Sequence, residues 1–215
     1  MKYLQFILIA IFLCSNAHAL TVTFDSCITN NNATDCSTGI NQLSVDVTEQ
    51  GSQVLFTFNN SGPLASSITD VYFDDGSLLG IASLIDADDG MGGDMGVDFS
   101  VGATPGNIPG ANGASPSFQT TAGFSADSDP AVQPNGVNPG EMLGILFDLQ
   151  GSQDYQDVID ELTTGALRIG IHVQGFDGGG SESFVNAPVP VPAAVWMFGT
   201  GLLAMIGFSR RRLTS

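Results

Sequence analysis

A glycine-rich run of aspartates in the middle of the chain is the pattern closest to a chemical function. It holds five carboxylates, on Asp86, Asp88, Asp89, Asp94 and Asp98. Ca²⁺ takes several oxygen ligands in flexible geometry, so the run is a candidate calcium loop. It departs from the EF-hand pattern, because Gly90 and Met91 stand where that loop has an Asp or Asn and then a glycine. A solvated acidic turn is the alternative, and both interpretations stay open.

Residue types give little support to nucleophilic catalysis. Once an N-terminal signal is removed, His172 is the one remaining histidine, either a surface residue or a base. The chain has no Gly-x-Ser-x-Gly turn for an activated serine. Paired carboxylates could hydrolyse glycosides, but Trp196 and Tyr3 lie in terminal signals, which leaves few rings for a sugar-stacking cleft. We therefore expect a non-enzymatic protein with no catalytic residues, and a secreted hydrolase is the less favoured alternative.

Two cysteines remain after the signal. Cys14 lies in the N-terminal apolar run, whereas Cys27 and Cys36 follow it with eight residues between them. An even pair in an exported chain predicts a disulfide. The residues between the pair are rich in Asn and Thr and predict a surface loop. A metal site and a catalytic thiol are the alternatives, although no histidine is near in sequence.

The N-terminus has the order of a secretory signal peptide. Lys2 precedes an apolar run from Phe6 to Leu13, and Ala17 and Ala19 frame a small-x-small cleavage pattern. Cleavage after Ala19, following passage through the Sec translocon, would make Leu20 the mature N-terminus. A lipoprotein signal at Cys14 is disfavoured because Leu13 is too bulky for the residue before a lipidated cysteine.

The C-terminus has three parts in order: a Pro-rich motif, an apolar stretch and a cluster of arginines. The apolar stretch, residues 193–208, would span roughly 24 Å as a helix, short of the ~30 Å hydrocarbon core. Counting from Val189 gives 20 uncharged residues, with prolines in the first turn, where they are tolerated. We expect a transmembrane helix with its arginines in the cytoplasm; a buried C-terminal core helix is the alternative.

This tail resembles the PEP-CTERM sorting domain in its Val-Pro-x-Pro-Ala variant. The resemblance rests on Val189, Pro190, Val191, Pro192 and Ala193, followed by the apolar stretch and by Arg210, Arg211 and Arg212. It implies a Gram-negative bacterium that secretes exopolysaccharide, and processing near the Pro-rich motif by exosortase, a membrane-embedded cysteine peptidase. The family's Pro-Glu-Pro stands here as Pro-Val-Pro. The resemblance covers about 25 residues and implies nothing of the rest of the chain.

Between the two signals the chain is strongly acidic. All 22 Asp and Glu residues lie in residues 20–187, together with a single cation, Arg168, so this segment carries a net charge of −21. Such a field repels nucleic acid and anionic membrane surfaces. It favours solubility outside the cell, or binding of divalent cations or cationic partners.

Alternation of apolar and polar residues predicts about eight strands in this segment. They lie at 20–24, 43–48, 54–58, 68–73, 78–85, 97–101, 143–149 and 167–173. Asp154 is a candidate cap for one short helix over 155–162, which Gly165 would end. Residues 102–140 are rich in Pro and Gly and predict a long loop anchored by Phe118 and Phe124, and residues 177–183 predict a flexible spacer.

We therefore expect an all-β fold, an antiparallel β-sandwich of jelly-roll-like rather than immunoglobulin-like topology. The expected organisation is a signal peptide at 1–19, an exported domain at 20–187 and a sorting segment at 188–212. The expected function is that of an exported surface or extracellular-matrix protein, tethered to the inner membrane and then processed. Its expected partners are exosortase and exopolysaccharide, and nucleic acid is excluded. A calcium-dependent adhesion or polysaccharide-binding module is the alternative.

Overall fold

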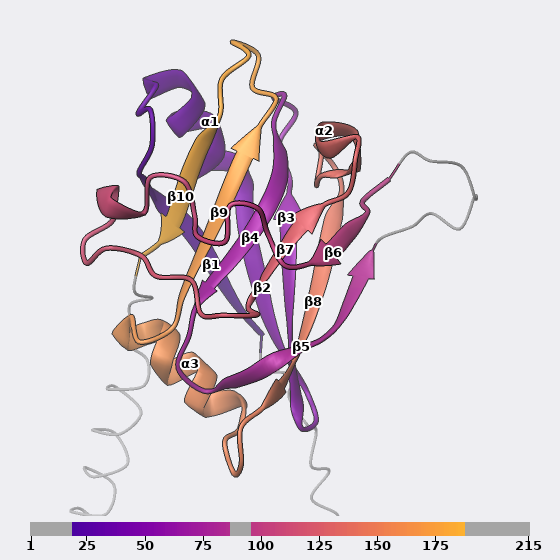
Figure 1. Cartoon of the computed structure of the whole chain (residues 1–215), viewed down its shortest axis with the longest axis vertical. Coiled ribbons are helices and arrows are strands. Elements are labelled where there is room, and N and C mark those ends of the chain that lie inside the picture. The colour runs from indigo at the N-terminus through magenta and orange to yellow at the C-terminus, as the bar shows by residue number, and fades with distance from the viewer. Residues whose placement is uncertain (1–18, 87–95, 188–215) are drawn as a thin grey trace, which may run out of the picture.

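The computed structural model describes residues 19–86 and 96–187, which form ten strands with helices around them (Figure 1). The strands are β1 (Ala19–Cys27), β2 (Leu43–Gln50), β3 (Gln53–Asn60), β4 (Ser67–Asp74), β5 (Leu78–Asp86), β6 (Phe99–Val101), β7 (Ser125–Ser128), β8 (Met142–Leu149), β9 (Arg168–Gln174) and β10 (Glu182–Asn186). The helices are α1 (Ala33–Gln42), α2 (Val132–Asn135) and α3 (Tyr155–Thr164), with a 3-10 turn, η1, at Ala111–Gly113.

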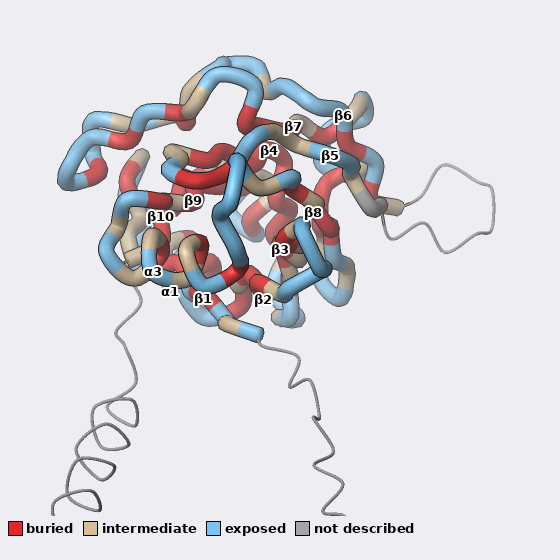
Figure 2. The backbone as a smooth tube through the Cα atoms, turned by 90° about the horizontal axis from the view of Figure 1, so that it is seen from below, coloured by how far each residue is buried: buried red, intermediate tan, exposed pale blue. Residues whose placement is uncertain are grey.

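The strands form one continuous sheet in the order β5-β8-β3-β2-β1-β10-β9-β4-β7-β6, and each pairing is antiparallel. Strand β1 belongs to both halves: residues 19–23 pair with β2, and residues 24–27 pair with β10, with a bulge between Phe24 and Ser26. The sheet curls back on itself, nearly into a barrel (Figure 2). The predicted all-β antiparallel fold is confirmed. The arrangement differs from a jelly-roll-like sandwich of two separate sheets in that β1 joins the halves.

Phenylalanine rings join the two halves of the sheet at the centre of the core. Phe73 of β4 meets Phe147 of β8 edge-on with ring centroids 4.7 Å apart, and Phe56 of β3 at 5.1 Å. All three side chains are fully buried. Each such pair adds roughly 0.5–1.5 kcal/mol beyond the apolar area it buries. The inward residues of the alternating strands therefore form one core cluster that spans both halves.

All eight strands that alternation predicts are present, but two further strands are not among them. Strand β7 lies inside the predicted long loop, and β10 begins inside the predicted spacer. Both carry polar residues that sequence reasoning places in solvent. Glu182 and Ser183 of β10 are fully buried. Their burial is tolerated because their polar atoms form hydrogen bonds with neighbouring elements.

The prediction of only one helix is wrong. A further helix, α1, occupies part of the segment that the sequence predicts as a surface loop. Asn32 caps α1 by accepting the amide of Thr34 at 3.0 Å, and the carboxyl group of Glu182 accepts the amides of Asn31 and Asn32. Gly39 fits against the ring of Phe184, where an added Cβ would lie 2.2 Å from Cζ. The sequence of α1 lacks an apolar periodicity. The helix is therefore held in place by its contacts with β10 rather than by an apolar face of its own.

The predicted helix over 155–162 is confirmed as α3. Asp154 and Asp157 form a capping box, and Gly165 ends the helix in the left-handed conformation with φ 77°. Val158 and Leu162 are fully buried and close one end of the core. The Tyr155 hydroxyl donates to the Val47 carbonyl at 3.1 Å, which ties α3 to β2.

Residues 102–121, which we call the strap, cross the outer face of β9 and β4 (Figure 1). The strap packs closely: an added Cβ at Gly170 of β9 would lie 2.7 Å from Ile108 Cδ1. Arg168 clamps it by donating to the carbonyls of Pro116 and Ser117 and to Asp74, with its guanidinium 5.2 Å from the Phe118 ring centroid. The described residues include no other Lys or Arg, so this clamp has no substitute among them.

Within residues 19–86 and 96–187 there is no helix of sufficient length and hydropathy to cross a bilayer. The predicted transmembrane segment at 193–208 lies outside the described residues.

Candidate functional site

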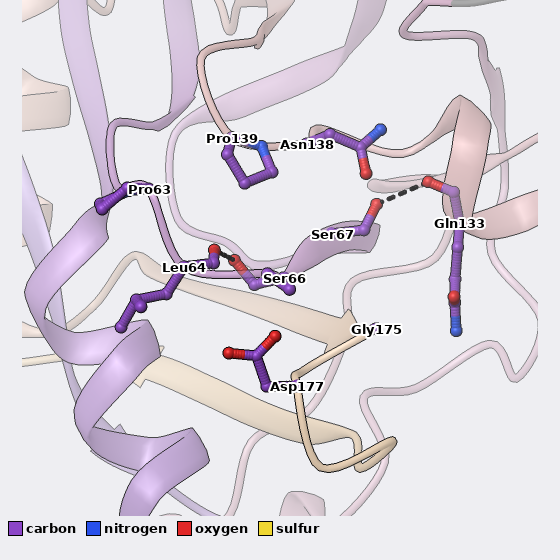
Figure 3. A pocket seen from close by; sticks show the side chains of 10 residues that line it. Pro63, Leu64, Ser66, Ser67, Gln133, Asn138, Pro139, Gly175 and Asp177 are labelled. Atoms are coloured by element: carbon purple, nitrogen blue, oxygen red, sulfur yellow. Dashed lines mark hydrogen bonds between the residues drawn. The ribbon is translucent and has the colours of Figure 1, made fainter.

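Two adjoining pockets lie at the end of the sheet that carries α1 and α2. The first has a volume of about 430 Å³ and lies between the start of β4, α2 and the β9–β10 turn (Figure 3). Its polar lining comes from Ser66, Ser67, Gln133, Asn138 and Asp177, and its apolar lining from Pro63, Leu64 and Pro139. Ser67 donates to the Gln133 carbonyl at 2.9 Å, which fixes α2 against β4.

The second pocket, of about 810 Å³, lies between α1 and the loop after β3. Pro63 and Leu64 line both pockets, and Leu64 is 47% exposed. We call the two pockets together the Leu64 groove. The helix contributes small hydroxyl and amide side chains to it, on Thr34, Ser37, Thr38, Asn41 and Gln42. The groove is therefore an open surface site with a saddle of apolar atoms in the middle.

A buried network of amides supports the floor of the Leu64 groove. Gln42 donates to Asn60 Oδ1 at 3.1 Å, to the Leu64 carbonyl at 2.8 Å and to Ser66 Oγ at 2.6 Å. Asn60 in turn donates to the carbonyls of Ser66 and Val137 at 3.0 and 3.1 Å. This network joins the end of α1 to the loop of Leu64. Because fully satisfied buried networks are rigid, the groove is preformed.

A second cluster of titratable residues lies on the outer face of the sheet under the strap. Cross-strand pairing places Asp127, Asp70, His172 and Ser183 side by side on β7, β4, β9 and β10. We call them the polar row. Asp70 is 5% exposed and accepts the hydroxyl of Thr69 at 2.8 Å and that of Tyr72 at 3.3 Å. The strap contacts this row, since Thr104 donates its amide to Asp127 at 3.3 Å.

Burial shifts the pKa of two members of the polar row, Asp70 and His172, and of the neighbouring Tyr72. Burial of Asp70, together with the neighbouring charge of Asp127, raises the pKa of Asp70 to about 6. Burial also raises the pKa of the Tyr72 hydroxyl and lowers the pKa of His172. His172 Nδ1 lies 3.0 Å from Ser183 Oγ, but Ser183 is fully buried, so this serine–histidine pair has no access to a substrate.

A third group of carboxyls lies near the turn between β4 and β5. Burial raises the pKa of Asp75 to about 6, and the nearby charges of Glu161 and Asp74 act in the same direction. Glu161 accepts the amide of Ser77 at 2.7 Å, which ties α3 to this turn. These carboxyls stabilise the local structure by accepting hydrogen bonds from backbone amides.

The predicted disulfide between Cys27 and Cys36 is present, with Cα atoms 5.7 Å apart. Both sulfurs lie close to Glu182, and this trio is the one cluster of metal-type ligands within residues 19–86 and 96–187. Because the sulfurs are bonded to each other, neither offers a thiolate to a metal. The cluster is therefore structural: it joins the end of β1 to α1 and β10.

Most of the predicted calcium loop lies outside the residues that the structure describes. Asp88, Asp89 and Asp94 lie outside the described residues, and Asp86 is the last residue of β5. Asp98 is exposed, and its backbone is fixed by bonds to Asn135 at 2.9 Å and Asp129 at 2.9 Å. The structure brings no second residue of the predicted loop to Asp98 among those described.

Most of the predicted signal peptide and the predicted sorting segment also lie outside the residues that the structure describes. Ala17 and the sorting residues at 189–193 and 210–212 are outside the described residues. Ala19 and Leu20 are described, as the first residues of β1. The Leu64 groove and the polar row, by contrast, were missed by sequence reasoning, because their members come from segments that are far apart in the chain and have no shared motif.

In comparisons with known proteins, no family model, no curated protein and no solved structure matches this chain.

Proposed function

We propose that the chain is an exported, non-enzymatic surface or extracellular-matrix protein that is sorted by its C-terminal segment. The observation that carries the proposal is the order of the last residues, in which Val189–Ala193, an apolar stretch and Arg210–Arg212 follow directly on the described fold. In this proposal the signal peptide is removed after Ala19, and exosortase cuts near the Pro-rich motif.

The limits of the fold support this division of the chain. The buried hydrophobic residues of the described part lie between Val22 and Val185, and the last strand ends at Asn186. Cleavage after Ala19 would leave every described residue of the core in the mature protein. The Cys27–Cys36 disulfide adds support, because disulfides persist mainly in oxidising compartments outside the cytosol.

The direction of the chain ends gives the tethered protein an orientation. Strand β1 begins beside the end of β2, and β10 ends beside the start of β9, at the end of the sheet opposite to α1, α2 and the Leu64 groove (Figure 1). A chain held at the membrane by residues beyond 187 would therefore present the groove outward. This favours a polysaccharide-binding module over a calcium-dependent adhesin or a hydrolase as the second candidate function.

Mass spectrometry of the mature protein from its own host tests the sorting proposal. We expect an N-terminus at Leu20 and a C-terminus near 189–192. The double variant Pro190→Ala/Pro192→Ala should keep its tail and stay in the membrane fraction. Pro139→Ala, an exposed loop proline, is the matched control and should be processed normally. A chain recovered at its full mass in the cytoplasm would disprove the proposal.

The calcium alternative has its own test. If the aspartates of residues 86–98 hold Ca²⁺, the ion should raise the melting temperature of the purified protein, since a ligand that binds the folded state stabilises it. An unchanged melting temperature at millimolar Ca²⁺ removes this alternative without affecting the sorting proposal.

A further inference from the structure

The Leu64 groove differs in charge from the rest of the molecule. Residues 20–187 carry a net charge of −21, yet Asp177 is the one charged residue that lines the groove. The other lining groups are hydroxyls, amides, glycines and apolar side chains. A surface with a single charged residue inside so acidic a domain points to an uncharged ligand with many hydrogen-bonding groups.

The first pocket offers polar atoms that are free to bind. Gln133 is exposed, and in the described part of the chain its side-chain amide makes no hydrogen bond. The Asp177 carboxylate likewise has no partner there, and it faces the pocket in Figure 3. Both residues line the pocket and can offer a donor and acceptors to a ligand, while Pro139 supplies an apolar wall.

The second pocket is also lined by polar side chains, here along α1, where the amide of Asn41 donates to Ser37 Oγ at 3.2 Å. Thr34, Ser37 and Asn41 are spaced by three and four residues, which places them on one side of the helix facing the loop of Leu64. Pro63 and Leu64 lie between these residues and the first pocket. Polar groups therefore alternate with apolar surface along the length of the groove.

We propose that the Leu64 groove binds a chain of uncharged sugar units. A pyranose presents hydroxyls at its rim and C–H groups on its faces, and the groove offers amides and hydroxyls on either side of an apolar saddle. Two adjoining pockets suit an oligosaccharide better than a single sugar. The inference deepens the proposed function, and rests on it for the setting in which the sugar is met.

The same features argue against other ligands. An acidic polysaccharide would be repelled by the field of the domain, where Arg168 is the one cation and clamps the strap. A metal ion would find a single carboxylate, Asp177. A peptide that adds a strand needs a free sheet edge, whereas helix side chains and loops line this groove.

Titration calorimetry on the full-length chain in mild detergent tests the proposal. The probes are hexasaccharides of a neutral glucan, mannan and galactan, with alginate and polygalacturonate hexasaccharides as acidic counterparts and a Pro-rich peptide as a third class. We expect at least one neutral hexasaccharide to bind, its disaccharide to bind more weakly, and the acidic sugars and the peptide to give no heat.

Two matched pairs of variants locate the binding. Gln133→Ala should weaken affinity by about threefold to tenfold, the effect of one hydrogen bond, whereas Gln153→Ala, an equally exposed glutamine before α3, should not. Leu64→Ala should weaken binding similarly, whereas Leu79→Ala, 61% exposed on β5, should leave it unchanged. All four side chains are at least partly exposed, so their melting curves should match that of the parent.

The proposal is overturned if no neutral hexasaccharide binds, if acidic sugars or the peptide bind as well, or if the groove variants bind like their controls. Sorting is read separately from the masses of the mature termini. A correctly processed chain that binds no sugar would refute the groove and leave the proposed function standing, while a sugar-binding chain that is never exported would do the reverse.

Discussion

Asp70 and Asp127 lie directly opposite each other on β4 and β7, with both carboxyls on the outer face of the sheet beneath the strap. Like charges opposed across a strand pair are destabilising. Burial of Asp70 adds to this effect, and its pKa is raised to about 6. Asp70 therefore holds its proton at mildly acidic pH and loses it near neutrality.

Replacing Asp70 with Asn should stabilise the protein at neutral pH. At pH 7.5 the buried carboxyl is ionised at a cost that its neutral isostere avoids, so Asp70→Asn should raise the free energy of unfolding by about 1–3 kcal/mol. At pH 5 the native carboxyl is largely protonated and the gain should shrink. Urea unfolding at both pH values measures this. Asp25→Asn, exposed on β1, is the control, and an equal gain from it would refute the explanation.

Stability of the unaltered protein should fall as pH rises from 5 to 7.5. The pKa values of Asp70 and Asp75 are raised from 3.8 to about 6 by folding, so the folded state binds more protons in this window. Their contribution is complete below about pH 4 and is lost as pH rises through about 6. His172 opposes the trend below its ordinary pKa, because burial disfavours its charged form. Thermal melts across the range, with His172→Gln to remove the opposing group, test the sign.

Loss of the Arg168 clamp should release the strap. Arg168→Ala removes the ion pair with Asp74 and two hydrogen bonds to strap carbonyls, which should lower the free energy of unfolding by about 2 kcal/mol. Arg168→Lys keeps the positive charge but loses the planar guanidinium that donates to several acceptors at once. Its free energy of unfolding should therefore lie between those of the parent and Arg168→Ala. Limited proteolysis should show new cuts between 105 and 118. Unchanged cleavage in Arg168→Ala would show that the strap is held by its apolar contacts alone.

Removal of the disulfide should loosen α1 and lower stability. The bond joins residues nine positions apart, and closing so short a loop contributes roughly 2–3 kcal/mol in the chain-entropy model. The Cys27→Ser/Cys36→Ser variant should unfold at lower denaturant concentration, and hydrogen exchange should rise in residues 33–42. Reduction of the parent protein should reproduce the shift; if it does not, the serines themselves cause the loss.

The capping box of α3 should be worth about 1 kcal/mol. Asp154→Ala leaves the first amides of α3 without their acceptor, since Asp154 Oδ1 accepts from Gln156 at 2.8 Å. Asp160→Ala, an exposed change later in the same helix, should cost only a few tenths of a kcal/mol. Chemical denaturation of both variants separates a capping effect from a general effect of lost charge.

Local signals explain why α3 and eight strands could be predicted. The strands alternate with period two, and α3 carries its cap, its apolar face and its stop within twelve residues. The helix α1 and strand β10 could not be predicted in this way, because they depend on each other: Glu182 reaches amides 150 and 151 positions earlier in the chain. A buried glutamate and a polar helix look solvent-exposed until that long-range contact is known.

The candidate site was beyond sequence reasoning for a related reason. Gln133 and Leu64 line one groove although 69 positions separate them in the sequence, and no motif connects them. The aspartates of residues 86–98 form an obvious motif because they are adjacent in the chain. Adjacency makes a pattern easy to recognise, while a binding surface needs only proximity in space.

The position of β10 between β1 and β9 has a mechanical consequence. A pull on residue 187 that is directed along the strand axis and resisted at the far end of the sheet would shear β10 between its two neighbours. Shear loads the backbone hydrogen bonds to both neighbouring strands at the same time, whereas peeling would break these hydrogen bonds one after another. Because β10 pairs with a neighbour on each side, it would resist such a pull more strongly than an edge strand would.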